Sequence, residues 1–169
     1  DIAAHGGVED RVDRFVRADL DAGLPDDVGD GLDIVLAADV LEHVRRPDVI
    51  LEQVRERLAP AGSLLVSVPN FGHWYPRTRV ALGRFDYDRR GILDRDHVRF
   101  FTRRSFEHLV DEAGFEIGRR DATGLPLEVA DRGSGGRDDG SGPAASVVAS
   151  IDRFGVALRP QLFAYQFVY

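Results

Sequence analysis

Residues 32–37 read LDIVLA, a nearly continuous apolar run that follows the turn residues Gly-Asp-Gly at 29–31. Such runs are typical of strands buried inside a parallel sheet. A second run of this kind, SLLVSV, occupies residues 63–68. Between the two runs, apolar residues recur at helical spacing over residues 47–58, which predicts a helix. Strand, helix and strand together predict a βαβ unit with a right-handed crossover.

The rest of the pattern predicts one α/β domain with a mostly parallel sheet. Further helices are expected at residues 105–113 and 145–158, and further strands at 12–18, 115–120 and 162–169. We expect the last of these strands to lie inside the sheet rather than to form an exposed aromatic edge. Residues 132–145 are rich in Gly, Ser and Asp, which predicts a flexible loop.

Composition excludes several kinds of chemistry. The 169 residues include no cysteine and no lysine. Disulfides, thiolate zinc sites, cysteine nucleophiles and Schiff bases are therefore excluded. The chain has 29 acidic and 22 basic residues and a net charge of −7, which argues against nucleic acid and anionic membranes as partners. It contains neither a membrane-spanning run nor a signal pattern, which predicts a cytoplasmic protein with no membrane span.

Ligands of open α/β sheets bind beyond the carboxyl ends of the strands. Asp19 directly follows the strand predicted at 12–18, and its carboxylate either accepts hydrogen bonds from a ligand or caps a turn. Ala37 and Ala38 end the strand at 32–37, where small side chains allow a ligand to approach the backbone closely. These strand ends are candidate binding positions.

Glu42 and His43 follow the same strand and suggest metal ligation or acid–base chemistry. No second histidine lies at the i+4 spacing of a zinc-binding helix. We therefore predict no metal site.

The long connection at residues 69–102 exceeds ordinary loop lengths, which predicts a lid or substrate-binding region. It contains the residues Phe71, His73, Trp74, Tyr75, Phe85, Tyr87, His97, Phe100 and Phe101. These rings either line a pocket for a small organic substrate or pack the lid onto the sheet. The acidic balance of the chain argues against a third interpretation, stacking on nucleic acid.

Three motifs, taken in their order and spacing, resemble class I S-adenosylmethionine (SAM)-dependent methyltransferases. They are RADLDAGLP at residues 17–25, DIVLAADVLEHV at 33–44 and LAPAGSLLVSVPN at 58–70. The segment PNFGHW at 69–74 resembles the MetW-like or methyltransferase type 11/12-like branch. The segment HVRFFTRRSFEHLVDEAGFEI at 97–117 is similar to the helix and strand that close many such domains. The resemblance implies a Rossmann-like, doubly wound fold.

The resemblance to SAM-dependent methyltransferases also implies SAM as the cofactor. Asp19 would accept from the adenine amino group, and Leu20 would contact or pack on the ring. Ala37, Ala38 and Asp39 would border the methionine part of the cofactor. Leu41 and His43 would form the wall on the helix side, and for His43 a role in local structure is the alternative.

The chain departs from this family pattern at its beginning. We find no GxGxG-type loop after a strand and no first two strands, and Asp1 would lie beside the expected ribose-binding acid. Read in this way, residues 1–169 are a partial, N-terminally truncated methyltransferase domain that lacks its first strands and Gly-rich loop. We expect such a chain to bind SAM weakly or not at all.

The implied reaction transfers a methyl group to a small-molecule, glycan or lipid-like acceptor, with oxygen as the favoured acceptor atom. His73 and His97 are the candidate general bases in the lid. Trp74, Tyr87 and Arg99 are candidate substrate-binding residues, and Arg79 or Arg95 could likewise hold an acceptor carboxylate.

Two other interpretations remain open. The chain is either a non-catalytic, MetW-like partner or regulatory module, or the C-terminal part of a multifunctional glycan-modifying enzyme with a fused or associated N-terminal domain.

Overall fold

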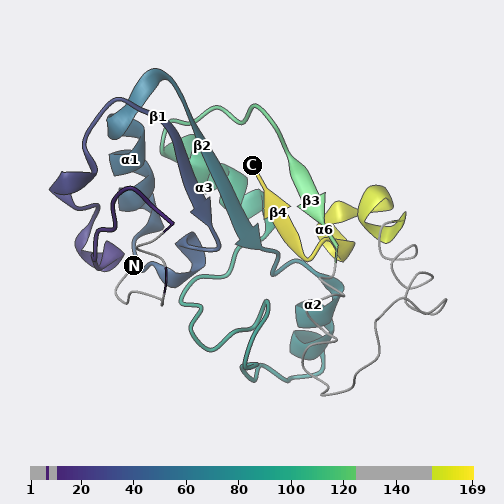
Figure 1. The fold of residues 1–169 in the computed structure, drawn as a ribbon. Coiled ribbons are helices and arrows are strands. Elements are labelled where there is room, and N and C mark those ends of the chain that lie inside the picture. Colours follow the sequence, from purple (N-terminus) through teal and green to yellow (C-terminus); the bar gives the residue numbers. More distant parts are fainter. Residues whose placement is uncertain (1–6, 8–10, 125–153) are drawn as a thin grey trace.

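The structure, a computed structural model, describes Gly7, residues 11–124 and residues 154–169. Its centre is an open sheet with the strand order β1-β2-β4-β3 (Figure 1). The strands are β1 (Leu32–Ala38), β2 (Leu58–Pro69), β3 (Asp121–Thr123) and β4 (Gln166–Val168). The helices are α1 (Pro47–Arg57), α2 (Trp74–Ala81), α3 (Arg103–Glu112) and α6 (Pro160–Phe163), and three short 3-10 turns are η1 (Leu20–Ala22), η2 (Asp26–Val28) and η3 (Leu41–His43). Within the described residues, no helix combines the length and the apolar character needed to cross a membrane.

The predicted βαβ unit is confirmed. β1 and β2 pair in parallel, with Val35 opposite Leu64, and α1 connects them. β2 begins at Leu58 rather than at residue 63, so it follows α1 directly. A Cβ on Gly62 would lie 2.5 Å from the Leu32 carbonyl oxygen, so only glycine allows the two strands to approach here.

The C-terminal strand lies inside the sheet, as predicted. β4 pairs antiparallel with β2 on one side and with β3 on the other. It is shorter than residues 162–169 because Pro160 begins the one-turn helix α6, which occupies part of that range. The α/β class is confirmed. The sequence predicts a mostly parallel sheet, but among the described strands only β1 and β2 pair in parallel, because β4 runs antiparallel to both of its neighbours.

Two strands predicted from the sequence are wrong. Residues 12–18 form bends and irregular backbone, because no described strand lies beside them to pair with. Arg14 instead holds this segment to η2 through an ion pair with Asp27 at 2.8 Å. Residues 115–120 are irregular too, since pairing with β4 starts only at Asp121. The segments predicted at 132–145 and, for the most part, at 145–158 lie outside the described residues.

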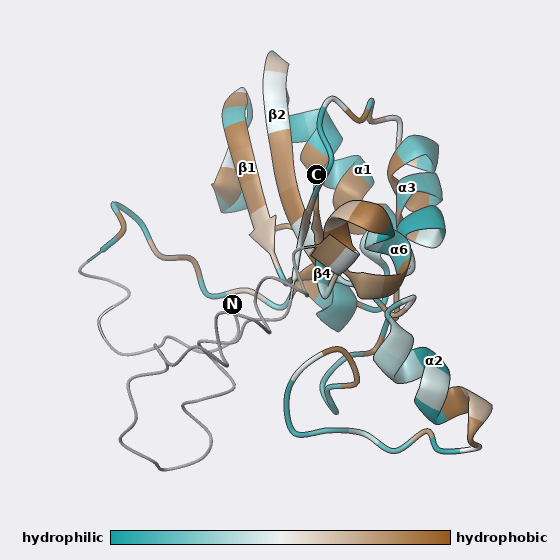
Figure 2. Cartoon of the chain, turned by 90° about the vertical axis from the view of Figure 1, so that its right-hand side faces the viewer, coloured by the Kyte–Doolittle hydropathy of each residue, from teal (hydrophilic) through white to brown (hydrophobic). Residues whose placement is uncertain are grey.

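The hydrophobic core lies on one face of the sheet. Helices α1 and α3 cover this face (Figure 2), and the core joins Leu51 of α1, Val68 of β2 and Phe106 of α3. On the opposite face Ile34 and Leu36 of β1 are 72% and 65% exposed. The expectation that β1 is buried on both faces is therefore wrong for the described residues.

Helix α3 confirms the helix predicted at 105–113, with a slightly earlier start. Thr102 and Ser105 form a capping box at its first turn. Gly114, with a φ of 81°, follows its end in the left-handed conformation that glycine adopts at helix ends.

Asn70 joins the end of β2 to two other parts of the chain. Its buried side-chain nitrogen donates to the carbonyl oxygens of Gln161 at 3.2 Å and Ala164 at 2.8 Å. Its side-chain oxygen accepts from the Gly72 amide at 2.8 Å. A Cβ on Gly72 would lie only 2.9 Å from that oxygen. The structure therefore explains the PNFG segment. The side-chain amide of Asn70 binds three backbone groups, and Gly72 leaves space for its oxygen.

Replacing Asn70 by alanine is expected to lower the free energy of unfolding by about 2–4 kcal/mol, because buried backbone groups lose their partners. Asn70→Asp should be no milder, since a carboxylate would face two carbonyl oxygens. Urea denaturation measures both. The control Ser63→Ala, on the exposed part of β2, should stay within about 0.5 kcal/mol of the parent. Equal stability of Asn70→Ala and the control would contradict this role.

Candidate functional site

The carboxyl end of β1 is held by a side-chain network. Asp39 follows the exposed Ala38 with a φ of 52°, in the left-handed region that a non-glycine residue adopts at a cost. The Ser67 hydroxyl donates to the Asp39 carboxylate at 3.0 Å and accepts from the Asp39 amide at 3.1 Å. Gln166 of β4 also donates to this carboxylate. Asp39 is therefore fixed between β1, β2 and β4.

The turn η1 begins directly after Asp19. Asp19 caps it by accepting from the Asp21 amide at 3.0 Å, as one of its two predicted roles requires. The Asp21 carboxylate accepts from the Arg45 amide at 2.8 Å, which ties η1 to the segment that follows η3. Leu20 is half-buried against the core. The Asp19 side chain remains exposed.

The turn η3 places three successive side chains in different surroundings. Leu41 is buried in the hydrophobic core and Glu42 is only 1% exposed, whereas His43 is exposed. The Glu42 carbonyl oxygen accepts from the amides of Val98 at 2.9 Å and Arg99 at 3.0 Å. These two bonds bring the end of the lid, residues 69–102, against η3.

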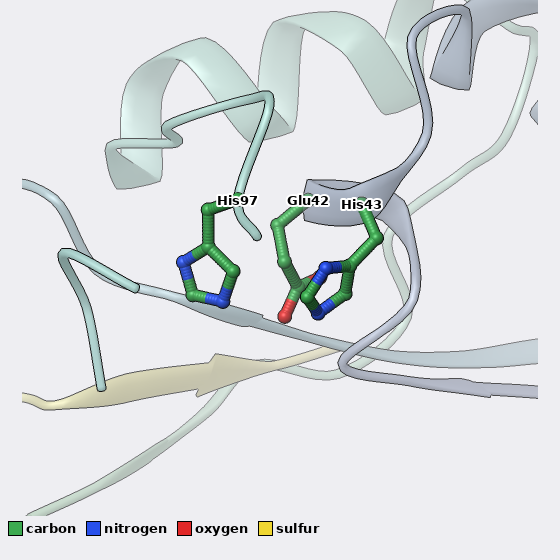
Figure 3. A group of neighbouring side chains, drawn as sticks. All are labelled: Glu42, His43 and His97. Atoms are coloured by element: carbon green, nitrogen blue, oxygen red, sulfur yellow. The ribbon is translucent and has the colours of Figure 1, made fainter. Parts of the chain in front are cut away.

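As a result, His97 meets Glu42 and His43 (Figure 3). One ligand atom from each of the three side chains lies within 4.8 Å of the others. The rings of His43 and His97 are 4.9 Å apart, edge to face. The Nδ1 of His43 lies 3.0 Å from the Asp96 carbonyl oxygen, and the Nδ1 of His97 lies 3.1 Å from that of Ile92.

These carbonyl partners determine that Nδ1 is a hydrogen-bond donor in both rings. A carbonyl oxygen can only accept a hydrogen bond, so each Nδ1 carries a proton, and in the neutral ring each Nε2 keeps a lone pair. Burial raises the pKa of the Glu42 carboxyl to about 7, and the charge of Asp39 adds to the rise. The cluster therefore offers two nitrogen lone pairs and a buried carboxyl group at the strand ends.

A family model described as a methyltransferase domain matches residues 3–118. The chain belongs to the methyltransferase domain family. The family resemblance of the three sequence motifs is thereby confirmed. No protein of curated function matches the sequence significantly.

Solved structures share the fold of this methyltransferase domain. A SAM-dependent methyltransferase from Archaeoglobus fulgidus is 16% identical, with a TM-score of 0.51 over 90% of this chain and 64% of that protein. A candidate methyltransferase from Bacillus halodurans is 15% identical, with a TM-score of 0.53 over 91% of this chain and 74% of that protein. The cyclase SpnF is 20% identical, with a TM-score of 0.51 over 96% of this chain and 56% of SpnF. The chain thus spans less than two thirds of the archaeal protein and of SpnF.

In this methyltransferase domain, the arginines predicted to hold an acceptor carboxylate have protein partners. Arg79 pairs with Asp88 at 2.8 Å and also contacts the Tyr75 hydroxyl at 2.7 Å. Arg99 donates to the Arg45 carbonyl oxygen at 3.1 Å. Arg79 is half-buried in the lid, whereas Arg99 and Arg95 are exposed, and these side-chain contacts belong to Arg79 and Arg99.

The lid aromatics divide between the two predicted roles. Phe101 is 8% exposed and Phe100 is half-buried, so both pack the lid onto the domain. Trp74 and Tyr87 are 45% and 55% exposed. These two rings are accessible to a ligand.

His73 has a structural task. It is buried and caps the N-terminus of α2, where its Nδ1 accepts from the Tyr75 amide at 3.2 Å. It does not belong to the cluster formed by Glu42, His43 and His97. Of the two histidines predicted as bases, the structure brings only His97 to the strand-end side chains.

Sequence reasoning missed this convergence. It searched for a second histidine one helical turn from His43, but His97 comes from the far end of the lid. The one hint in the sequence is that His97 stands close to the end of the lid, just before the chain returns to the domain.

Replacing His73 by alanine is expected to lower the free energy of unfolding by about 1–2 kcal/mol through the lost cap, and further through the cavity left by the ring. His73→Asn should recover part of this loss, because asparagine also caps helices. Urea denaturation followed by Trp74 fluorescence measures both. The matched control is His108→Asn on the exposed face of α3. An asparagine variant less stable than the alanine variant would contradict the capping role.

Proposed function

We propose that this domain transfers the methyl group of SAM to an oxygen atom of a small-molecule, glycan or lipid-like acceptor. The observation that carries the proposal is the cluster of Glu42, His43 and His97, which follows the open end of β1. The exposed Asp19 carboxylate begins η1, and the next carboxylate, Asp21, accepts from the Arg45 amide two residues after His43. Membership of the methyltransferase domain family supports it.

The residues present fit two parts of SAM. Asp19 uses one carboxylate oxygen as a cap and stays exposed, so the other oxygen is accessible to the amino group of adenine. The half-buried Leu20 provides an apolar surface beside it. The small Ala37 and Ala38, followed by the negative charge of Asp39, suit the methionine part and its positive sulfonium. Bound SAM would supply the electrophilic methyl group, and the chain supplies alignment.

In this proposal the lid, residues 69–102, binds the methyl acceptor. His97 has a free Nε2 lone pair that can orient an acceptor oxygen, and its Nδ1 bond to Ile92 fixes the ring. The exposed Trp74 and Tyr87 can contact the apolar part of the acceptor. His73 is assigned to positioning, since its ring caps α2.

The Asp19→Asn variant tests the cofactor site without removing the turn cap, because asparagine caps as well as aspartate. Loss of a charged acceptor for the adenine amino group is expected to weaken SAM binding about 10-fold or more. Calorimetry on the full-length gene product gives the dissociation constant. Asp26→Asn, at the exposed start of η2, is the control. Unchanged SAM affinity in Asp19→Asn would contradict the assignment.

The His97→Asn variant tests the acceptor side. We expect the rate of S-adenosylhomocysteine formation to fall about 100-fold, within the range for a positioned proton-transferring or orienting group. The assay offers SAM with a panel of phenols, hydroxy acids and sugars. His108→Asn should retain the parent rate. Tight SAM binding without turnover of any acceptor would instead favour the non-catalytic partner module.

A further inference from the structure

The cluster of Glu42, His43 and His97 has the composition of a metal centre. We propose that these three side chains bind one divalent first-row transition-metal ion. Two imidazole nitrogens and one carboxylate favour Zn²⁺, Co²⁺ or a similar ion over Mg²⁺ and Ca²⁺, which prefer oxygen ligands alone.

The first observation is the state of Glu42. Its side chain is 1% exposed, and among the described residues neither carboxylate oxygen has a hydrogen-bond partner. A buried carboxylate is ordinarily paired with a cation or bound to a metal, because an unpaired charge is costly in a nonpolar environment. Glu42 points toward the two histidines (Figure 3), so a cation among them would provide the missing partner.

The second observation is the orientation of the histidines. Both rings direct Nδ1 to a backbone carbonyl oxygen, of Asp96 for His43 and of Ile92 for His97. Metal-binding histidines commonly donate their other ring N–H to such a carbonyl, which fixes the ring and leaves the second nitrogen for the metal. Each of the two rings has its own carbonyl partner and so fits this pattern.

The third observation is the spacing. The candidate ligand atoms lie within 4.8 Å of one another, whereas bonds of about 2.0–2.2 Å in a tetrahedral shell place ligand atoms roughly 3.5 Å apart. Small side-chain rotations close this difference. His43 is exposed, so an ion can enter from solvent on its side.

Three protein ligands leave a coordination position open, as in catalytic rather than structural metal centres. Where the proposed function holds, this position would present the acceptor oxygen to the methyl group, and His97 would orient that oxygen through the metal. Metal binding itself does not depend on methyl transfer.

The test titrates the metal-free, full-length gene product with Co²⁺ and follows its visible d–d absorption. We expect one Co²⁺ per chain, displaced by Zn²⁺. Glu42→Gln and His97→Asn should each weaken Co²⁺ binding at least 100-fold. The control His108→Asn alters an exposed histidine that lies 3.3 Å from Glu112 but lacks a third ligand, and it should bind like the parent. Absence of Co²⁺ binding by the parent, or parent-like binding by Glu42→Gln and His97→Asn, would overturn the proposal.

Glu42→Gln removes a buried charge and keeps the shape of the side chain, so circular dichroism should show the parent fold. Paramagnetically shifted imidazole protons in the Co²⁺-loaded parent provide a second readout that needs no variant. Two histidines should shift, and a spectrum without shifted imidazole signals would also overturn the proposal. Co²⁺ binding without methyl transfer would refute the proposed function alone, and methyl transfer without Co²⁺ binding would refute the metal centre alone.

Discussion

The buried amide of Asn70 holds together the parts of the chain on which the candidate site depends. The side chain donates to the carbonyl oxygens of Gln161 and Ala164, just before β4, and the backbone amide of Asn70 donates to the Tyr165 carbonyl oxygen at 2.9 Å. The next residue, Phe71, donates to Phe101 at 2.7 Å, so the two ends of the lid meet at its base. Asn70 therefore holds the segment before β4 against the end of β2, and the backbone bond of the next residue, Phe71, closes the base of the lid.

From this base, backbone contacts determine where the lid places its side chains. The Glu42 carbonyl captures the amides of Val98 and Arg99, and His97 precedes them. Because η3 is anchored in the core through Leu41, the positions of Glu42 and His43 follow from core packing. The cluster thus results from a hydrophobic contact on one side and two backbone hydrogen bonds on the other.

Local patterns predicted the elements that depend mainly on local sequence. The apolar runs and the helical spacing between them identified β1, α1 and β2, and the apolar spacing over residues 105–113 identified α3. The strand expected at 12–18 fails because a strand needs a neighbour, which no local pattern reports. The candidate site was predictable only in part. Ala37, Ala38 and His43 follow from the end of β1, whereas the strand expected before Asp19 does not form. The approach of His97 depends on the return path of the lid.

The charges around the strand ends connect the two proposed ligands. Both the sulfonium of SAM and a divalent metal are cations, and two neighbouring cations repel each other unless each has its own counter-charge. Asp39 is held by neutral donors, Ser67 and Gln166, so its negative charge is not cancelled by a partner. Glu42 lies on η3 where the lid packs against it, and the guanidinium of Arg99 is turned to a backbone carbonyl instead. Separate carboxylates on the sheet side and the lid side are the arrangement that two adjacent cations require.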